Sequence, residues 1–340
     1  MHIFDDYLRP IKAAIASDPK SGRLRENLTF NDRTFDKVFN LKSFNQQVPE
    51  KSLLPSLEEF AKTVGLIPNF DQGLGLHPDF AHLKHSESLE NHYIVSMFVD
   101  IKGSTNLHAK YTPQTVWIIT NTIQRAAIHT CLIFGGYVHR LQGDGLFVYF
   151  GGRNMSPALA VERSLQFASV FSYFVKEDLK NLFTEQGIDQ IFTRIGIDLG
   201  YEKDVVWGMA GIGDISEVTT CSLHTSLASK MQSNATSNGI VVGDHIKNES
   251  PKLSDFYTPV CLRTGNENDR YIFRIPEERF NYTQYDFVWL KFLKNQDFIA
   301  TDFYGNVQLK SKATILSHRD TANLAPIAVK SKPYYNFNDC

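Results

Sequence analysis

The chain lacks several features that mark common classes of protein. No apolar run approaches the ~20 residues that a membrane-spanning helix needs, and residues 1–7 lack the basic and then apolar layout of a signal peptide. Only four cysteines occur, without a paired metal-ligand spacing. The formal net charge of −2 argues against a basic nucleic-acid-binding surface. These absences predict a cytoplasmic protein with reduced and mostly buried cysteines, and with neither a membrane nor a nucleic acid as partner.

The composition that remains is that of a folded globular protein. Hydrophobic residues make up 42% of the 340 residues and charged residues 21%, which suffices for one large domain with additions or for two domains. Residues 1–90 carry helical patterns, among them an amphipathic stretch at 56–62. Residues 91–275 are more regular. Residues 276–340 form a further region, with a helix expected at 285–293 and strand-like pieces around it.

Apolar periodicity in the middle region predicts strands interspersed with helices. Pro113 is expected to begin one long helix, and Ser156 with Pro157 to begin another. A shorter helix is expected at 225–233. Helices that cover one face of such a sheet predict an α+β fold. The expected strands are 93–99, 137–141, 146–150, 192–199, 205–210 and 240–242.

Two segments of this region share an unusual design. Asp100 in residues 96–105 and Asp144 in residues 141–147 each follow a hydrophobic strand and precede a glycine-containing turn. An aspartate placed there points a hard oxygen ligand into a backbone hollow that suits phosphate-bound Mg²⁺ or Mn²⁺. Aspartate beside glycine is also a common turn former, so either segment alone would indicate only a turn. The pair in this order favours a two-metal phosphoryl-transfer site.

The order of motifs resembles the catalytic domain of class III nucleotide cyclases, the family of adenylate and guanylate cyclases. The resemblance covers roughly residues 93–275, and it implies a ferredoxin-like palm with an N-terminal helical extension and a C-terminal extension. It also implies a head-to-tail homodimer whose active sites lie between the subunits. The matching segments are residues 98–105, 140–144, 194–200, 206–211 and 225–232.

The resemblance further implies which residues carry the chemistry. Asp100 and Asp144, with the backbone of Ile101, would hold two divalent ions, Mn²⁺ or Mg²⁺. The 3′-oxygen of a bound nucleoside triphosphate would attack the α-phosphorus and release pyrophosphate. Backbone amides and a permissive glycine would cradle the phosphates. These phosphate-binding positions are Ile101, Gly103, Ser104 and Thr105.

Two departures from the family pattern concern the base. Arg140 stands where adenylate cyclases have Lys and guanylate cyclases have Glu, and Thr219 stands near the usual base-reading Asp. Arginine offers only donors and reaches further than lysine, which suits a smaller base with carbonyl acceptors. Arg140 therefore favours a pyrimidine; the alternative is a surface arginine paired with an acidic neighbour.

Three further positions depart from the pattern or match it loosely. Ser226 stands where the family has a ribose-orienting Asn, and Lys230 where it has a transition-state Arg, so both would be catalytic positions with altered chemistry. Arg263 corresponds to a lysine that contacts the terminal phosphates, or else is a salt-bridged surface residue. Four histidines lack metal-ligand spacing and are predicted to be surface or packing residues: His108, His129, His139 and His224.

The combination resembles the pyrimidine cyclases of bacterial phage-defence (Pycsar) systems, which make cyclic UMP or cyclic CMP for a separate effector that binds the cyclic nucleotide. The residues do not distinguish UTP from CTP, and the resemblance alone leans toward UTP. Two alternatives stay open. One is an adenylate cyclase with an unusual pocket, and the other is a degenerate cyclase domain that senses a nucleotide.

Overall fold

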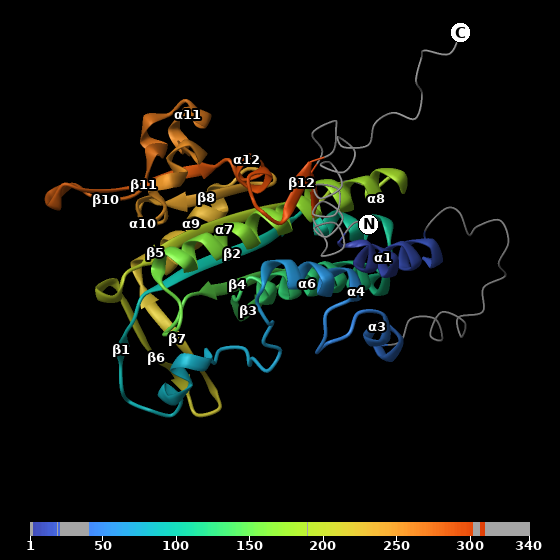
Figure 1. Cartoon of the computed structure of the whole chain (residues 1–340), viewed down its shortest axis with the longest axis horizontal. Coiled ribbons are helices and arrows are strands. Elements are labelled where there is room, and N and C mark those ends of the chain that lie inside the picture. Colours follow the sequence, from blue (N-terminus) through green and yellow to red (C-terminus); the bar gives the residue numbers. More distant parts are fainter. Residues whose placement is uncertain (1–2, 19, 21–40, 189, 302–306, 310–340) are drawn as a thin grey trace, which may run out of the picture.

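The computed structural model describes residues 3–18, 20, 41–188, 190–301 and 307–309. In this part of the chain the main sheet has the strand order β10-β11-β8-β5-β2-β4-β3, and β9 pairs with β11 (Figure 1). The strands are β2 (Ile94–Lys102), β3 (Tyr137–Gln142), β4 (Gly145–Phe150), β5 (Phe192–Gly200), β8 (Gly239–Gly243), β9 (Tyr257–Pro259), β10 (Tyr271–Ile275) and β11 (Phe280–Phe287).

The half of this sheet that ends at β3 is ferredoxin-like. In the order β5-β2-β4-β3 each neighbouring pair is antiparallel. Helix α6 (Pro113–Ile133) connects β2 to β3, and α7 (Pro157–Tyr173) connects β4 to β5. Thr112 and Ser156 cap these two helices with their side chains, and a proline follows each cap. The predicted α+β palm is therefore confirmed, with both of its long helices.

One face of the sheet carries the main hydrophobic core. Alternate residues of β2 point into it, because successive side chains of a strand face opposite sides. The helices that cover this face contribute large buried side chains to the same core. They include α1 (Asp5–Ser17), α4 (Pro55–Val64), α8 (Lys180–Glu185) and α12 (Trp289–Lys294). The β2 residues in this core are Val95, Met97, Val99 and Ile101.

The opposite face is covered by two separate units. Helix α9 (Leu223–Asn234) packs on β5, where a Cβ on Gly196 would lie 2.1 Å from the Ala228 carbonyl oxygen. A smaller sheet of β1 (Glu90–Asn91), β6 (Val205–Ile212) and β7 (Ile215–Ser222) projects as an arm (Figure 1). Its core stacks Phe80 on Trp207 at 4.0 Å between ring centroids.

The N-terminal helices are attached to α6 by polar contacts as well as by apolar ones. The Tyr7 hydroxyl bonds Nδ1 of the buried His129, whose burial lowers its pKa to about 4. The Asp18 carboxylate accepts from the backbone N–H and the hydroxyl of Thr112, both at 2.9 Å. Arg125 donates to the Asn45 side chain of α3 (Leu41–Gln47) at 2.7 Å. The beginning and middle of α6 are thus held by the N-terminal region.

The predicted helix at 285–293 is wrong in its first part. Strand β11 continues through Phe287, and α12 begins only at Trp289. Tyr285 pairs with Val242 of β8 on one side and with Pro259 of β9 on the other. These ladder partners lie far apart in the sequence, and they override the helical pattern of the segment.

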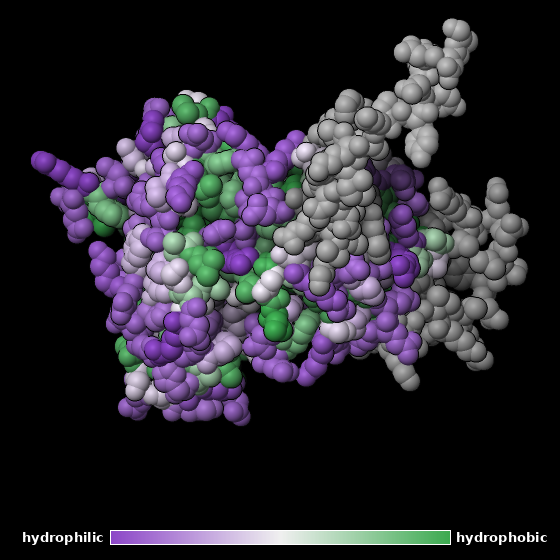
Figure 2. Space-filling model, in the orientation of Figure 1, coloured by the Kyte–Doolittle hydropathy of each residue, from purple (hydrophilic) through white to green (hydrophobic). Residues whose placement is uncertain are grey.

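The surface and the cysteines agree with the composition. Hydrophilic side chains dominate the face shown in Figure 2, where hydrophobic ones form small separate areas. Among the described residues, no helix combines the length and the apolar character that crossing a bilayer requires. Cys131 and Cys261 are buried and Cys221 is exposed, all as free thiols, while Cys340 lies outside the described residues.

Candidate active site

Asp100 and Asp144 meet at one end of the sheet. Asp100 lies near the end of β2, and Asp144 lies in the turn between β3 and β4. The pairing of Val99 with Leu146 places this turn beside Asp100. A Cβ on Gly145 would lie only 2.3 Å from the Val99 carbonyl oxygen, so a glycine is needed for this close approach. The chain thus brings the two predicted carboxylates together.

The Asp144 carboxylate lies in surroundings that disfavour its negative charge. Its Oδ2 atom is buried and has no hydrogen-bond partner among the described residues. Burial raises the pKa of this carboxyl, the Ser104 hydroxyl opposes that rise, and the nearby Asp100 charge adds to it. An unsatisfied buried acceptor of this kind costs about 1–3 kcal/mol or more. A divalent cation between the carboxylates would remove the cost, so the residues fit the metal site that the motif predicts.

Arg194, which had no role in the sequence-based site, orients Asp100. It stands opposite Asp100 on β5, and its Nε and one terminal nitrogen donate to Oδ2 of Asp100 at 3.0 and 2.5 Å. Both hydrogen bonds go to the same oxygen, which leaves Oδ1 for a cation. Arg194 therefore acts as a positioning residue. Only the three-dimensional pairing reveals it, because 94 residues separate the partners.

We expect Arg194→Ala to raise the metal concentration for half-maximal activity several-fold, because the Asp100 carboxylate would lose its fixed orientation. Arg194→Lys should recover part of the effect, since it keeps the charge without the fork. Metal titrations of initial rate measure this. Arg153→Ala, which removes an exposed ion pair with Glu90, is the control. An unchanged metal dependence in Arg194→Ala would contradict the assignment.

The predicted phosphate loop follows Asp100 directly. Gly103 has φ +95°, and a Cβ there would lie 3.2 Å from the Gln190 carbonyl oxygen. The short helix η2 (Ser104–Asn106) begins after it. The Ser104 hydroxyl donates to the Ile101 carbonyl at 3.4 Å. The left-handed glycine thereby turns the chain so that Ser104 and Thr105 line a pocket.

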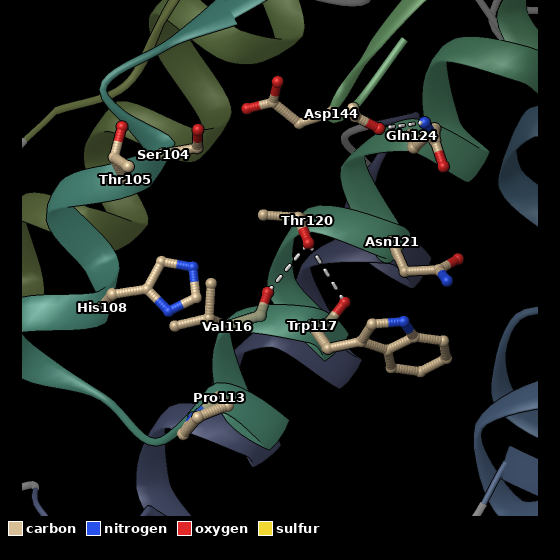
Figure 3. A pocket seen from close by; sticks show the side chains of 11 residues that line it. Ser104, Thr105, His108, Pro113, Val116, Trp117, Thr120, Asn121, Gln124 and Asp144 are labelled. Atoms are coloured by element: carbon tan, nitrogen blue, oxygen red, sulfur yellow. Dashed lines mark hydrogen bonds between the residues drawn. The ribbon is translucent and has the colours of Figure 1, made fainter. Parts of the chain in front are cut away.

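This pocket, of about 540 Å³, lies between the loop, the β3–β4 turn and α6 (Figure 3). Such a volume suits a nucleotide-sized ligand. In Figure 3 the Asp144 carboxylate and the Ser104 side chain lie at one end of the pocket, and Trp117 lies on α6 at the other. Gln124 donates to the Gly143 carbonyl at 3.1 Å and so ties the turn to α6. The lining residues are Ser104, Thr105, His108, Pro113, Val116, Trp117, Thr120, Asn121, Gln124, Gly143 and Asp144.

The predicted base-reading residues lie elsewhere, between β3 and the arm. Arg140 on β3 donates from Nε to Glu217 of β7 at 2.7 Å. It therefore has the acidic neighbour that the alternative prediction, a paired surface arginine, included. Thr219 lies two residues after Glu217 and faces the same side of β7. His139, which precedes Arg140 on β3, is buried, and this burial lowers its pKa to about 3. Glu217 is a polar group of this area that sequence reasoning missed.

The remaining predicted residues are also outside the described pocket. Ser226 and Lys230 are exposed and one turn apart on α9, which places them on one face. Arg263, in α11 (Val260–Thr264), donates to Asp286 at 2.8 Å and to the Asn234 carbonyl at 3.1 Å. Within one chain, the structure brings Asp100, Asp144 and the phosphate loop together. It does not add Arg140, Thr219, Ser226, Lys230 or Arg263 to that pocket.

Curated proteins match this chain in sequence over most of its length. No family model matches the sequence. A cytidylate cyclase of Staphylococcus aureus is 32% identical over 310 residues, which are 85% of this chain and 72% of that protein. A cytidylate cyclase of Escherichia coli is 30% identical over 299 residues, which are 77% of this chain and 64% of that protein.

Among solved structures, the adenylyl cyclase CyaB of P. aeruginosa aligns with a TM-score of 0.48 and 18% identity, over 59% of this chain and 96% of that one. The sequence relatives carry the identification, together with the palm topology and the Asp100–Asp144 pair. The chain belongs to the family of the bacterial cytidylate cyclases.

Proposed function

We propose that the chain converts a pyrimidine nucleoside triphosphate, CTP above all, to its 3′,5′-cyclic monophosphate and pyrophosphate. The observation that carries this proposal is the unpaired, buried oxygen of Asp144 beside Asp100, at the end of a nucleotide-sized pocket. Two divalent ions, Mn²⁺ or Mg²⁺, would when bound activate the 3′-oxygen and neutralise the triphosphate. The name of the sequence relatives, cytidylate cyclase, supports the choice of base.

The chain's own residues would bind and orient the substrate. Asp100 and Asp144 would hold the cations, and Arg194 keeps the Asp100 carboxylate in place. The backbone of Ile101 to Thr105 would receive the triphosphate, since the turn at Gly103 places Ser104 and Thr105 on the pocket wall. Ser226 and Lys230 would contact the ribose and the developing charge from the second subunit.

The pairing of Arg140 with Glu217 explains why CTP is preferred in this proposal. Cytosine presents acceptors at O2 and N3 and a donor at its amino group, and Arg140 and Glu217 offer the complementary donor and acceptor. Uracil has a carbonyl in place of that amino group, which would face the Glu217 carboxylate. The resemblance to phage-defence cyclases alone favours UTP, whereas Arg140, Glu217 and the name of the sequence relatives support CTP.

Base selectivity is the test of this function. Purified protein incubated with equimolar CTP, UTP, ATP and GTP and Mn²⁺ should yield mainly cyclic CMP, identified by mass spectrometry. Loss of a charged hydrogen bond, at about 1.5–3 kcal/mol, corresponds to a discrimination of roughly 10- to 100-fold. Mainly cyclic AMP would instead establish the adenylate cyclase alternative. The absence of any cyclic product in wild-type protein that binds nucleotide would favour the sensor alternative.

Glu217→Gln sharpens this test. Glutamine can donate to the O4 carbonyl of uracil, so the ratio of CTP to UTP turnover should fall, while Arg140→Ala should lower the rates with both pyrimidines. Glu267→Gln, which alters an exposed pair with Arg270, is the matched control. A CTP-to-UTP ratio that Glu217→Gln leaves unchanged would contradict base reading by this pair.

We also propose that the active enzyme is a head-to-tail homodimer, because the base and ribose residues lie outside the pocket of their own chain. Alone, Asp100→Ala chains should be inactive, and Arg140→Ala chains should have strongly lowered activity. Mixed, they should regain up to about a quarter of wild-type activity, since half of the dimers are hybrids and each hybrid has one intact site. Size-exclusion chromatography with differently tagged chains confirms exchange. Exchange without recovery would count against shared sites.

The cyclic nucleotide would act in the cytoplasm as a second messenger of antiviral defence, read by a separate effector that binds it. Support for this part comes from the resemblance to the pyrimidine cyclases of phage-defence systems. Cells that carry the enzyme and its effector should accumulate cyclic CMP on phage infection. Cells that carry Asp144→Asn should not.

A further inference from the structure

A second group of ligand-type side chains lies at the opposite end of β5 from Arg194. Asp204 ends the short helix η4 (Glu202–Asp204) at the base of the arm. His224 is the second residue of α9, and His245 is the second residue of α10 (Asp244–Glu249). Each offers one ligand atom, and these atoms all lie within 4.8 Å of one another. Three elements that are separate in the sequence thus converge on one point.

Both imidazole rings are oriented by a hydrogen bond at the same nitrogen. His224 Nδ1 lies 2.8 Å from Oδ2 of Asp198, and His245 Nδ1 lies 2.8 Å from the Leu199 carbonyl oxygen. Each bond leaves Nε2 of its ring for a further partner. Metal-ligating histidines typically show this arrangement, in which a carboxylate or a backbone carbonyl fixes the tautomer and the direction of the ring.

The Asp198 carboxylate, which orients the His224 ring, is itself held in place. Asp198 is fully buried, and its other oxygen accepts from the Tyr282 hydroxyl at 2.8 Å. A Cβ on Gly243 would lie 2.3 Å from that oxygen, so the glycine provides the space for the carboxylate. The two rings lie 4.3 Å apart between centroids. Two oriented imidazoles and one carboxylate therefore lie close together.

We infer that Asp204, His224 and His245 bind one divalent transition-metal ion of the zinc type. Two imidazoles and one carboxylate suit Zn²⁺, whereas Mg²⁺ and Ca²⁺ prefer oxygen ligands. In a tetrahedral site, zinc bonds of about 2.0–2.2 Å place the ligand atoms roughly 3.4 Å apart, so the three side chains would have to close by up to about 1.4 Å on binding the ion. The fourth position is left for water.

This site is distinct from the pair Asp100 and Asp144. Arg194, which faces Asp100, precedes Asp198 by four residues on β5, a separation of about 13 Å along the strand. The ion would join the base of the arm to the beginnings of α9 and α10. His224, taken from the sequence as a surface or packing residue, is buried, and here it gains a specific role.

Metal binding by the full-length protein tests the inference. Protein stripped with a chelator is given excess Mg²⁺ and then one equivalent of Zn²⁺, desalted, and analysed for zinc; Co²⁺ serves as the spectroscopic probe. Wild type should retain about one zinc and show the absorption of a four-coordinate cobalt site. His245→Ala and Asp204→Asn should lower the zinc affinity at least ~10-fold. His82→Ala, at an exposed histidine, and Asp100→Asn should leave it unchanged.

Two outcomes would overturn the inference. One is a wild-type protein that retains no zinc, and the other is a zinc affinity that neither His245→Ala nor Asp204→Asn changes. Both residues are only half-buried, so these variants should fold, which circular dichroism checks. His224→Gln is less suitable because its ring is buried. Asp198→Asn provides a second test. It removes the carboxylate that orients the His224 ring, so it should weaken zinc binding although no metal ligand is lost.

Discussion

Asp144→Asn is expected to lower cyclic nucleotide formation at least ~10³-fold, while the midpoint of thermal unfolding stays equal or rises. The rate falls because a cation ligand that supplies several kcal/mol of transition-state stabilisation is lost. Stability is kept because the substitution removes a buried charge that has no hydrogen-bond partner at Oδ2. Initial rates with Mn²⁺ and a thermal denaturation curve of the same preparation measure both quantities.

Asp100→Asn should lose activity to a similar degree, but it also breaks the ion pair with Arg194. That pair is partly exposed, so its loss should change the free energy of unfolding by no more than about 1 kcal/mol. Asp255→Asn, at an exposed position, is the matched control for both variants. Near wild-type rates in either site variant would refute the assignment of the two carboxylates.

Gly145→Ala should strongly lower both activity and stability, whereas Gly143→Ala, two residues earlier in the same turn, should have a smaller effect. An added Cβ at Gly145 meets the Val99 carbonyl oxygen at 2.3 Å, so the turn must move away from β2 and carry Asp144 with it. Gly143 has φ +60° but open space around its Cβ position. Strain at Gly143 should cost about 1–2 kcal/mol, and at Gly145 the steric conflict at the site adds to the loss.

The comparison of these two glycine variants separates turn strain from displacement of the site. The metal concentration for half-maximal activity should rise much more in Gly145→Ala than in Gly143→Ala, because only the former moves one carboxylate relative to the other. Equal effects of the two substitutions on this quantity would mean that close approach at Gly145 does not set the site geometry.

What the sequence predicted well is local in the chain. The Asp100 and Asp144 motifs each consist of a strand and a turn within about ten residues, and the palm follows from such segments in order. What it missed depends on partners far apart in the chain. Arg194 bonds Asp100 across 94 residues, and Glu217 bonds Arg140 across 77. A sequence pattern contains no signal for such pairs.

Partners that are distant in the sequence also explain the wrong helix prediction and the metal-ligand group that the sequence did not reveal. Residues 285–287 belong to β11 because strands β8 and β9 pair with them, although their own pattern also allows a helix. His224 and His245 have no metal-ligand spacing, and they meet Asp204 only because β5 ends where α9, α10 and the arm begin. A spacing rule detects ligand sets within one element or hairpin, and this set comes from three elements.

The attachment of the N-terminal helices to α6 bears on how the catalytic region can be isolated. A fragment that began near residue 91 would leave the apolar side of α6 exposed to water, and it would remove the Asp18 carboxylate that holds Thr112. Since α6 also forms one wall of the pocket, such a fragment would be prone to aggregate and would bind nucleotide poorly. Residues 3–18 and 41–64 are in this sense part of the smallest unit that can be expected to fold as an enzyme.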